Sequence, residues 1–147
     1  MLAVDTNILV YAHSPQESHH AAALAALTWL ADRARPWAVT VSSLVEFTRI
    51  CSHSRLLRRS IDETCAALDA IAAAPGCRII GLGGSDWLAF RDAVIEGRAA
   101  GNLAFDAHIV AACRSHGVAA VLTEDLDFAR FRSIRALRLT DDWQRVA

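Results

Sequence analysis

Four acidic residues near the ends of short apolar segments are the residues of this sequence best suited to chemistry. Asp5 follows "LAV", Glu46 lies shortly after "AVTV", and Asp106 begins a helical segment that leads to "VAAVL". Asp125 follows that run within "TEDLDF" at 123–128, which has three carboxylates and no basic residue. If the apolar segments are parallel strands, all four carboxylates lie at one edge of a sheet.

A cluster of four carboxylates is unfavourable unless a cation lies among them. Two carboxylates about 4 Å apart repel by roughly 4 kcal/mol at an effective dielectric near 20. Oxygen ligands without His or Cys select hard divalent ions, so the acids predict a site for Mg²⁺, for which Mn²⁺ can substitute. Such an ion positions water against a phosphodiester and stabilises the leaving oxyanion. Without metal, we expect the like charges to raise the pKa of at least one of these carboxyls.

Each acid also has a structural explanation when it is taken alone. Ser43 and Glu46 have the spacing of a capping box, and Asp106 suits the first turn of a helix, where the helix dipole favours an anion. Asp5 can form an Asx turn, and Asp125 can cap the turn before "FARF". These explanations leave the gathering of four acids at one edge unexplained.

Short apolar runs alternate along the chain with longer segments of helical periodicity. The runs are aliphatic on both faces, which is typical of strands buried in a parallel sheet, and they lie at 2–4, 38–41, 78–82, 118–122 and 134–139. The helical segments lie at 18–34, 60–74, 85–98 and 102–116, and Glu46 falls in the first turn of a further helix. This alternation predicts an α/β fold, a single-domain α/β/α sandwich over 1–147 with a central, mostly parallel sheet.

The composition excludes several classes of function. All fifteen basic residues are arginine, so neither a P-loop lysine nor a Schiff-base lysine is available. The four cysteines form no C-x-x-C pair, which argues against a zinc site and predicts free thiols. The N-terminus lacks the features of a signal peptide, and the apolar stretch 21–31 is about half the length that spans a bilayer. We therefore expect a cytoplasmic protein with no membrane segment.

Four segments carry a family resemblance: "AVDTN" at 3–7, "SSLVEFTRICSHSR" at 42–55, "GNLAFDAHIVAACRSHG" at 101–117 and "LTEDLDFARF" at 122–131. In this order they resemble the PIN-domain family, and in particular the VapC-type ribonuclease toxins of bacterial toxin–antitoxin pairs. The sequence departs from the sub-group at Ser54, where proline usually follows the histidine. The resemblance implies a metal-dependent endoribonuclease that cleaves structured RNA such as tRNA or rRNA.

The resemblance also implies roles for single residues. The family's catalytic, metal-binding acidic quartet matches Asp5, Glu46, Asp106 and Asp125. Groups that look suited to orienting these carboxylates are Thr6, Asn7 and Thr123. Asp127 matches a position that is often acidic in the family, where it would bind a second ion.

RNA contacts must come from local arginines, because the formal net charge is −1 and no global positive field exists. The candidate RNA-binding residues lie close to Glu46 in sequence: Arg49, Arg55, Arg58 and Arg59. A second group is interpreted as an ordinary solvated face: Arg130, Arg132, Arg135 and Arg138. His108 points away from Asp106 on a helix, which indicates packing and not catalysis.

A partner surface is predicted by the apolar content of 54%. The resemblance implies a small antitoxin that covers the active-site groove, and we also expect a homodimer. We predict that the antitoxin inserts an arginine toward Asp5 and Asp106. Helix 18–34 with Trp29 and helix 42–52 with Phe47 are the expected walls of the groove.

Two alternatives to the ribonuclease remain open. A non-catalytic PIN-like module would use the acidic pocket only to bind protein, but such a module would be expected to lose one of the four acids. A metal-dependent DNA nuclease or phosphohydrolase would share the same metal chemistry, and the four acids fit it equally well.

Overall fold

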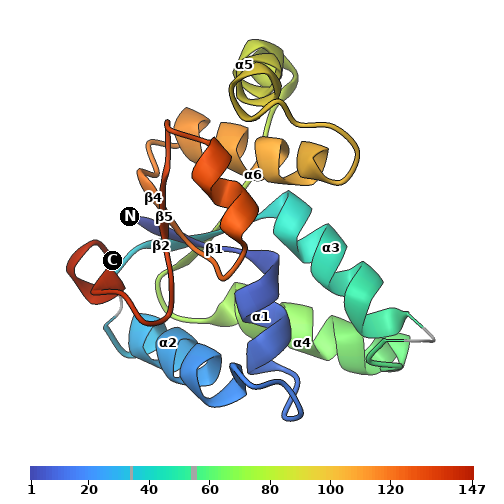
Figure 1. Ribbon diagram of the computed structural model, residues 1–147. Coiled ribbons are helices and arrows are strands. Elements are labelled where there is room, and N and C mark those ends of the chain that lie inside the picture. Colours follow the sequence, from blue (N-terminus) through green and yellow to red (C-terminus); the bar gives the residue numbers. More distant parts are fainter. Residues whose placement is uncertain (34, 54–55) are drawn as a thin grey trace.

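The computed structural model describes residues 1–33, 35–53 and 56–147 and contains one five-stranded parallel sheet (Figure 1). The strand order is β3-β2-β1-β4-β5, and β1 pairs in parallel with both neighbours, Leu2 lying opposite Trp37 and Ala120. The strands are β1 (Leu2–Val4), β2 (Trp37–Thr40), β3 (Cys77–Ile80), β4 (Ala120–Leu122) and β5 (Arg135–Leu137). The predicted parallel α/β sheet is therefore confirmed.

Helices cover both faces of the sheet and complete the predicted sandwich. Helices α1 to α4 lie on one side, and α5 and α6 lie on the other (Figure 1). They are α1 (Thr6–Ala12), α2 (His20–Arg33), α3 (Val41–Ser52), α4 (Ile61–Ala73), α5 (Trp87–Gly97) and α6 (Leu103–Ser115). Three short 3₁₀ helices are η1 (Gly84–Asp86), η2 (Leu126–Arg130) and η3 (Trp143–Arg145). None of the helices in the described ranges is long and apolar enough to cross a membrane.

The alternation of side chains along each strand divides the interior into two cores. In β1, Leu2 and Val4 pack with the α1–α4 side, whereas Ala3 packs with α5 and α6. All three residues are fully buried, and β4 repeats the pattern. Both faces of these strands are apolar because helices cover both, so the sequence shows no polar–apolar alternation.

The chain reverses its direction of travel across the sheet between β3 and β4. It runs from β1 outward through β2 to β3, and then returns to place β4 on the opposite side of β1. A crevice forms beyond the carboxyl ends of the strands at such a reversal. Asp5 and Thr123 are the first residues after β1 and β4, and the Asp5 N–H donates to the Leu122 carbonyl at 3.1 Å.

Near this crevice the structure adds one helix that was not predicted and corrects the predicted start of another. Helix α1 was not predicted, because its seven residues are too few for a periodic pattern and its central residues are all buried. Helix α3 begins at Val41, and its N-cap is Thr40, whose Oγ1 accepts the Ser43 N–H at 3.0 Å. Glu46 therefore lies in the second turn of the helix, and the capping box of Ser43 and Glu46 is wrong.

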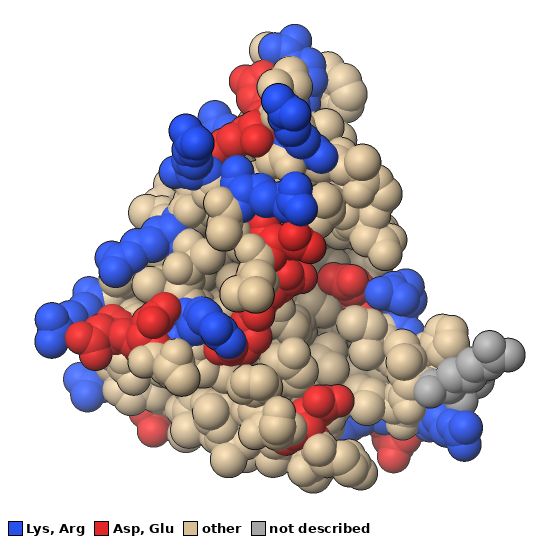
Figure 2. Space-filling view, in the orientation of Figure 1, with Lys and Arg blue, Asp and Glu red and all other residues tan. Residues whose placement is uncertain are grey.

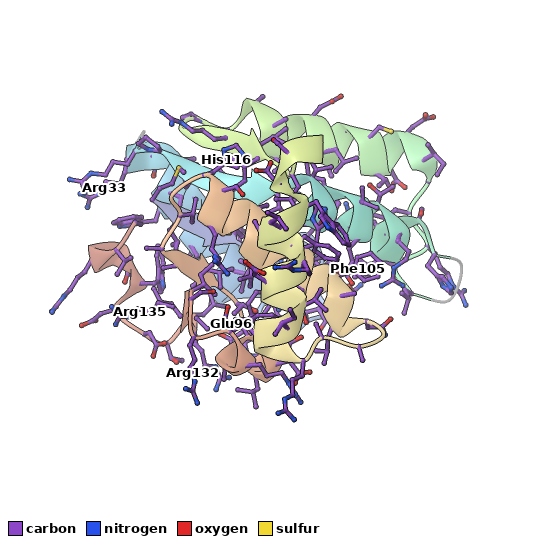
Figure 3. All side chains as sticks on the ribbon, turned by 90° about the horizontal axis from the view of Figure 1, so that it is seen from above. Arg33, Glu96, Phe105, His116, Arg132 and Arg135 are labelled. Carbon is purple, nitrogen blue, oxygen red and sulfur yellow. The ribbon has the colours of Figure 1, made fainter. Side chains whose placement is uncertain are left out.

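Helix α5 fixes the segment between η2 and β5. Its Glu96 carboxylate accepts hydrogen bonds from Ser133 N at 2.6 Å and Ser133 Oγ at 2.7 Å. Figure 3 labels Glu96 and Arg132, the residue before Ser133. A Cβ atom on Gly97 would lie 2.2 Å from the Phe131 ring, so glycine permits close packing here. The α5 side thereby positions η2, which carries Asp127.

Candidate active site

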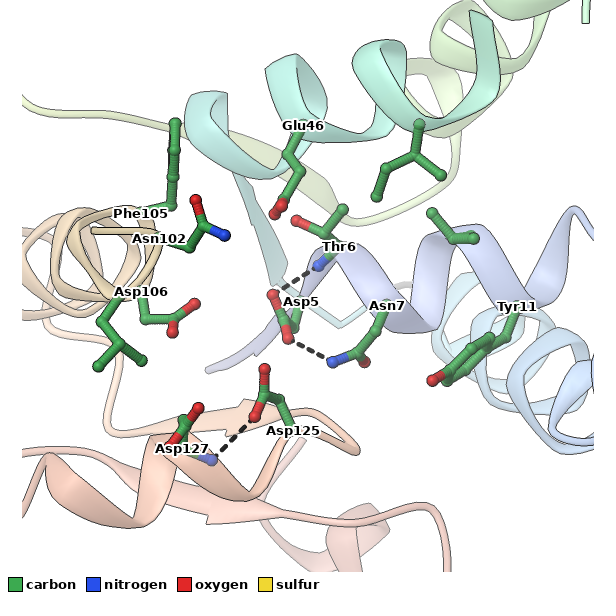
Figure 4. Close-up of a pocket in the computed structure, with 13 residues that line it drawn as sticks. Asp5, Thr6, Asn7, Tyr11, Glu46, Asn102, Phe105, Asp106, Asp125 and Asp127 are labelled. Carbon is green, nitrogen blue, oxygen red and sulfur yellow. Dashed lines mark hydrogen bonds between the residues drawn. The ribbon is translucent and has the colours of Figure 1, made fainter. Parts of the chain in front are cut away.

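A pocket of about 330 Å³ opens at the carboxyl ends of β1 and β4 (Figure 4). The five acids predicted to bind metal line this carboxylate pocket: Asp5, Glu46, Asp106, Asp125 and Asp127. They come from four separate parts of the fold: the β1–α1 junction, α3, α6 and the turn that begins η2. No arginine lies among the lining residues, so the part of the chain that the structure describes places no cation inside the pocket.

Asp5 is the most firmly held of these acids. It is 4% exposed and caps α1 by accepting the Thr6 N–H at 2.6 Å on Oδ1. Its other oxygen, Oδ2, accepts hydrogen bonds from Asn7 Nδ2 and from Thr123 Oγ1, both at 2.7 Å. The residues predicted to orient the carboxylates therefore all contact Asp5, and the Asx turn with Asn7 is replaced by a helix cap.

The Thr123 hydroxyl group connects three residues of the pocket. While it donates to Asp5, its oxygen accepts Asn7 Nδ2 and the Asp125 N–H, each at 3.0 Å. One donor and two acceptor positions are all that a hydroxyl group has, so Thr123 is fully used. The amide oxygen of Asn7 also accepts the Glu124 N–H at 3.3 Å. These bonds tie the end of β1 to the end of β4.

The remaining acids of the pocket have fewer hydrogen bonds. Asp125 caps η2 by accepting the Asp127 N–H at 2.8 Å, as its structural explanation predicted, and its carboxylate also lines the pocket. Asp106 lies in the first turn of α6, and none of the described residues donates a hydrogen bond to it. In Figure 4 the carboxylates of Asp5, Glu46 and Asp106 point toward a common space.

The pKa values of two pocket carboxyls are raised. Burial raises the pKa of Asp5 from 3.8 to about 6, against the lowering effect of its hydrogen bonds to Thr123 and Thr6. Burial also raises the pKa of Asp106 to about 7, and the negative charges of Asp5, Asp125 and other pocket acids add to this effect. The predicted rise in pKa is present, but burial is its largest cause, and the like charges are the smaller of the two effects that raise these pKa values.

The donors of the carboxylate pocket fit a hydrated hard cation. Among the described residues, no three His, Cys, Asp or Glu side chains converge into a ready coordination shell. Mg²⁺ usually keeps several water ligands and binds through one or two carboxylates, so an open pocket suits it. The buried Thr6 hydroxyl lines the pocket with no hydrogen-bond partner in the described structure, which fits a water molecule in the pocket.

The remaining carboxylate of "TEDLDF" has a different place. The Glu124 side chain is 6% exposed, and its Oε2 accepts Arg138 Nη2 at 2.7 Å and Nε at 2.9 Å. Its Oε1 accepts the Leu139 N–H at 2.7 Å. Burial alone would raise the pKa of Glu124, but these bonds lower it below its usual value. Arg138, interpreted from the sequence as solvated, therefore neutralises a buried acid.

Of the arginines predicted to bind RNA, one borders the carboxylate pocket. Arg49 Nη2 lies 3.2 Å from Glu46 Oε1. Arg59 donates to the His13 carbonyl oxygen, and Arg58 is an exposed residue with a positive φ of 53°. Arg55 lies outside the described residues.

Of the two predicted walls of the groove, helix 42–52 lines the pocket as α3, through Glu46 and Ile50 and not through Phe47, whereas helix 18–34 is wrong. Phe47 is fully buried, and Trp29 packs edge-on against Trp143 with ring centroids 5.2 Å apart, away from the pocket. The apolar and amide residues of the walls come from α1, α3 and the α6 region, and the sequence analysis missed them: Val10, Tyr11, Ile50, Asn102, Leu103 and Phe105. Asn102 and Phe105 lie close to Asp106 in the sequence, and this closeness is the one feature from which they could have been predicted to line the pocket.

His108 links two of the helices that carry pocket acids. Its Nδ1 lies 2.6 Å from Ser42 Oγ, and its ring packs on Phe90 with centroids 5.7 Å apart. Ser42 is on α3, His108 on α6 and Phe90 on α5. The structure thus gives His108 the packing role expected, together with a hydrogen bond between α3 and α6.

The fold and the site define a class of α/β protein with a carboxylate pocket at the switch point of a parallel sheet. Residues 2–134 match the PIN domain, so the chain belongs to the PIN domain family. It is 36% identical to ribonuclease VapC43 of Mycobacterium tuberculosis over 137 residues, 92% of each chain, which confirms the predicted resemblance to the VapC ribonucleases.

Solved structures share the fold at lower identity. VapBC2 of Rickettsia felis, bound to a DNA fragment from its promoter, has a TM-score of 0.68 at 20% identity and covers 93% of this chain and 97% of its own. VapC20 of Mycobacterium tuberculosis, a Sarcin-Ricin loop cleaving toxin, has a TM-score of 0.67 at 19% identity, with coverage of 92% and 99%. These likenesses confirm the predicted fold.

Proposed function

We propose that the protein is a metal-dependent endoribonuclease and the toxin of a toxin–antitoxin pair. The observation that carries this proposal is the carboxylate pocket, in which five acids from four parts of the fold surround one space. A chain that is 36% identical over 92% of its length to a ribonuclease supports RNA as the substrate. Because substrates such as tRNA or rRNA are found in the cytoplasm, we expect the protein to act there.

The residues of the pocket have different roles in the proposed phosphodiester hydrolysis. Asp5, Asp106 and Asp125 would hold a divalent ion, which when bound would supply positive charge for the phosphate and a water of lowered pKa. The hydrogen bonds from Thr6, Asn7 and Thr123 fix the Asp5 carboxylate before substrate arrives, so little reorganisation is needed. Glu46 and Asp127 lie on opposite sides of this group, and Asp127 is the candidate ligand of a second ion.

Cleavage should require Mg²⁺ or Mn²⁺ and stop when EDTA is added. None of the described residues that line the pocket is an arginine or a lysine, so they offer the charge of the reacting phosphate no compensation without a metal ion. Cleavage of total RNA and the sequencing of new 5′ ends measure the activity and its target. Undiminished RNA cleavage in EDTA would contradict the metal-dependent mechanism.

The same assay separates the alternatives. A DNA nuclease would cleave single-stranded DNA in preference to RNA, and a binding module would cleave neither. The intact set of acids and the raised pKa of Asp106, which a cation would reverse, favour an enzyme.

The partner that we propose is a small antitoxin that places an arginine in the carboxylate pocket. The similar folds include the VapBC2 complex, and the pocket here combines three acids that pair with no arginine among the described residues with the walls Tyr11, Ile50 and Phe105. An inserted guanidinium would relieve the repulsion that a metal ion otherwise relieves. Binding of the antitoxin should therefore compete with the metal and stop cleavage.

A homodimer is proposed through the exposed apolar surface of α3, α5 and α6. Val45 is 59% exposed and Trp87 is 62% exposed, and Val41 and Phe105 are each 47% exposed. Val45→Asp should shift the mass measured by light scattering from that of two 15.9 kDa chains to that of one. Ile61→Asp, at a 64% exposed site on α4, is the control that should leave the dimer intact. A monomeric wild-type protein would contradict the proposal.

A further inference from the structure

The five acids of the carboxylate pocket fall into two groups. In the described structure, the inner acids pair with no arginine: Asp5, Asp106 and Asp125. The outer acids, Glu46 and Asp127, each pair with an arginine three residues further along the chain. Arg49 Nη2 lies 3.2 Å from Glu46, and Arg130 Nε lies 3.0 Å from Asp127.

The two arginines lie on opposite sides of the pocket. Arg49 is on α3 and Arg130 is at the end of η2, and their side chains are 60% and 50% exposed. Figure 2 shows a band of acidic side chains in the hollow of this face, with basic side chains on both sides of it. The rim of the pocket thus carries positive charge where its floor carries negative charge.

We infer that Arg49 and Arg130 bind the phosphates on either side of the scissile phosphate, so that the RNA strand crosses the pocket from α3 to η2. The inference rests on the proposed ribonuclease function. Every nucleotide carries a negative charge, which the acids repel, and a metal ion in the pocket offsets this only for the reacting phosphate. The neighbouring phosphates need separate cations, and the rim arginines are placed to supply them.

The ion pairs with the outer acids hold these arginines at the rim of the pocket, but the pairs are weak enough to break when a phosphate binds. An exposed pair three residues apart on a helix is weak, so a phosphate can replace the carboxylate as its partner. Arginine binds phosphate through two parallel N–H bonds, which gives the exchange a favourable geometry. When the arginines move to the phosphates, Glu46 and Asp127 become free to face a cation, so RNA binding and metal binding favour each other.

The test compares Arg49→Ala and Arg130→Ala with a matched control. Arg145 forms the same kind of pair, with Asp142 at 3.4 Å, is 83% exposed, and lies on η3 away from the pocket. Each rim substitution should raise KM for RNA about ten-fold with little change in kcat. The slope of log KM against log salt should also fall by about 0.7 for each lost phosphate contact. Arg145→Ala should change neither quantity, and the lysine variants Arg49→Lys and Arg130→Lys should keep the salt slope.

Three results would overturn the inference. If the wild type cleaves RNA and both rim variants behave as Arg145→Ala does, the proposed ribonuclease function stands and the inferred path of the RNA strand is wrong. A rise in the metal concentration for half-maximal activity, with KM unchanged, would show that the arginines act through Glu46 and Asp127. If the rim variants bind the antitoxin more weakly while KM for RNA is unchanged, the two arginines contact the antitoxin and not the RNA. If the wild type cleaves no RNA, the proposed function fails, and fluorescence anisotropy of labelled RNA still tests the two arginines by the same comparison.

Discussion

Replacement of Asp106 by asparagine should abolish RNA cleavage and should also stabilise the metal-free protein. Loss of one carboxylate ligand weakens the hold on the ion and on the phosphate, and we expect kcat/KM to fall by about 10³-fold or more. The gain in stability has a separate cause, because the Asp106 carboxylate is partly buried among other acids and receives no hydrogen bond from the described residues. Asparagine removes the charge and gives up no bond.

The pH dependence of this gain follows from the raised pKa of Asp106. Its pKa is about 7 in the folded protein against an ordinary value of 3.8, so the folded state binds the proton more tightly than the unfolded state. Metal-free wild-type protein should therefore become more stable as the pH falls from about 8 to about 4. Asp106→Asn lacks this contribution. Its advantage, about 1–2 kcal/mol after allowance for the solvent exposure of the carboxyl, should be largest above pH 7 and vanish near pH 4.

Urea denaturation in EDTA at several pH values measures both curves. Asp69→Asn, at an exposed position on α4, is the control for a general effect of removing a negative charge. Asp5 should leave a weaker pH dependence of the same sign in the variant, since burial raises its pKa to about 6. If Asp106→Asn lowers the stability of the metal-free protein at pH 8, Asp106 has a structural role, and its negative charge does not destabilise the folded protein.

The centre of the sheet could be predicted from the sequence because β1 and β4 are apolar on both faces and each is followed by a polar residue. The position of Asp5 directly after β1 places it at the switch point, whatever the detail of the loops. Helix α1 could not be predicted in the same way. Its residues Ile8, Leu9 and Val10 are all buried, so the amphipathic pattern that marks a surface helix is missing.

The acids of the site could be predicted, whereas their surroundings could not. A carboxylate at a strand end points to the edge of the sheet in any parallel fold, but a groove wall depends on how each helix is turned. Within α3, Phe47 faces the core and Ile50 faces the pocket, although both are apolar. Glu124 likewise meets Arg138 through the pairing of β4 with β5, fourteen residues away, and no local pattern reveals it.

Thr123→Val should impair the enzyme through the position of Asp5 and Asp125, although Thr123 itself is not a proposed metal ligand. Valine has nearly the shape of threonine but lacks the hydroxyl that donates to Asp5 and accepts from Asn7 and the Asp125 N–H. The Asp125 N–H is left without this partner at a partly buried site, and Asp5 loses a donor at 2.7 Å. We expect a loss of stability of about 1–3 kcal/mol and a 10- to 100-fold loss of activity.

The readouts of Thr123→Val distinguish positioning from a general loss of fold. The Thr123 hydrogen bond lowers the pKa of Asp5, so its removal should raise that pKa further above about 6. The destabilisation should therefore be greatest above pH 7 and should shrink as the pH falls toward the ordinary value of 3.8. The metal concentration for half-maximal activity should rise, and excess Mn²⁺ should restore part of the activity. Thr123→Ser keeps the hydroxyl and should behave as wild type in both measurements. A fully active Thr123→Val protein would mean that Asp5 is held well enough by Thr6 and Asn7 alone.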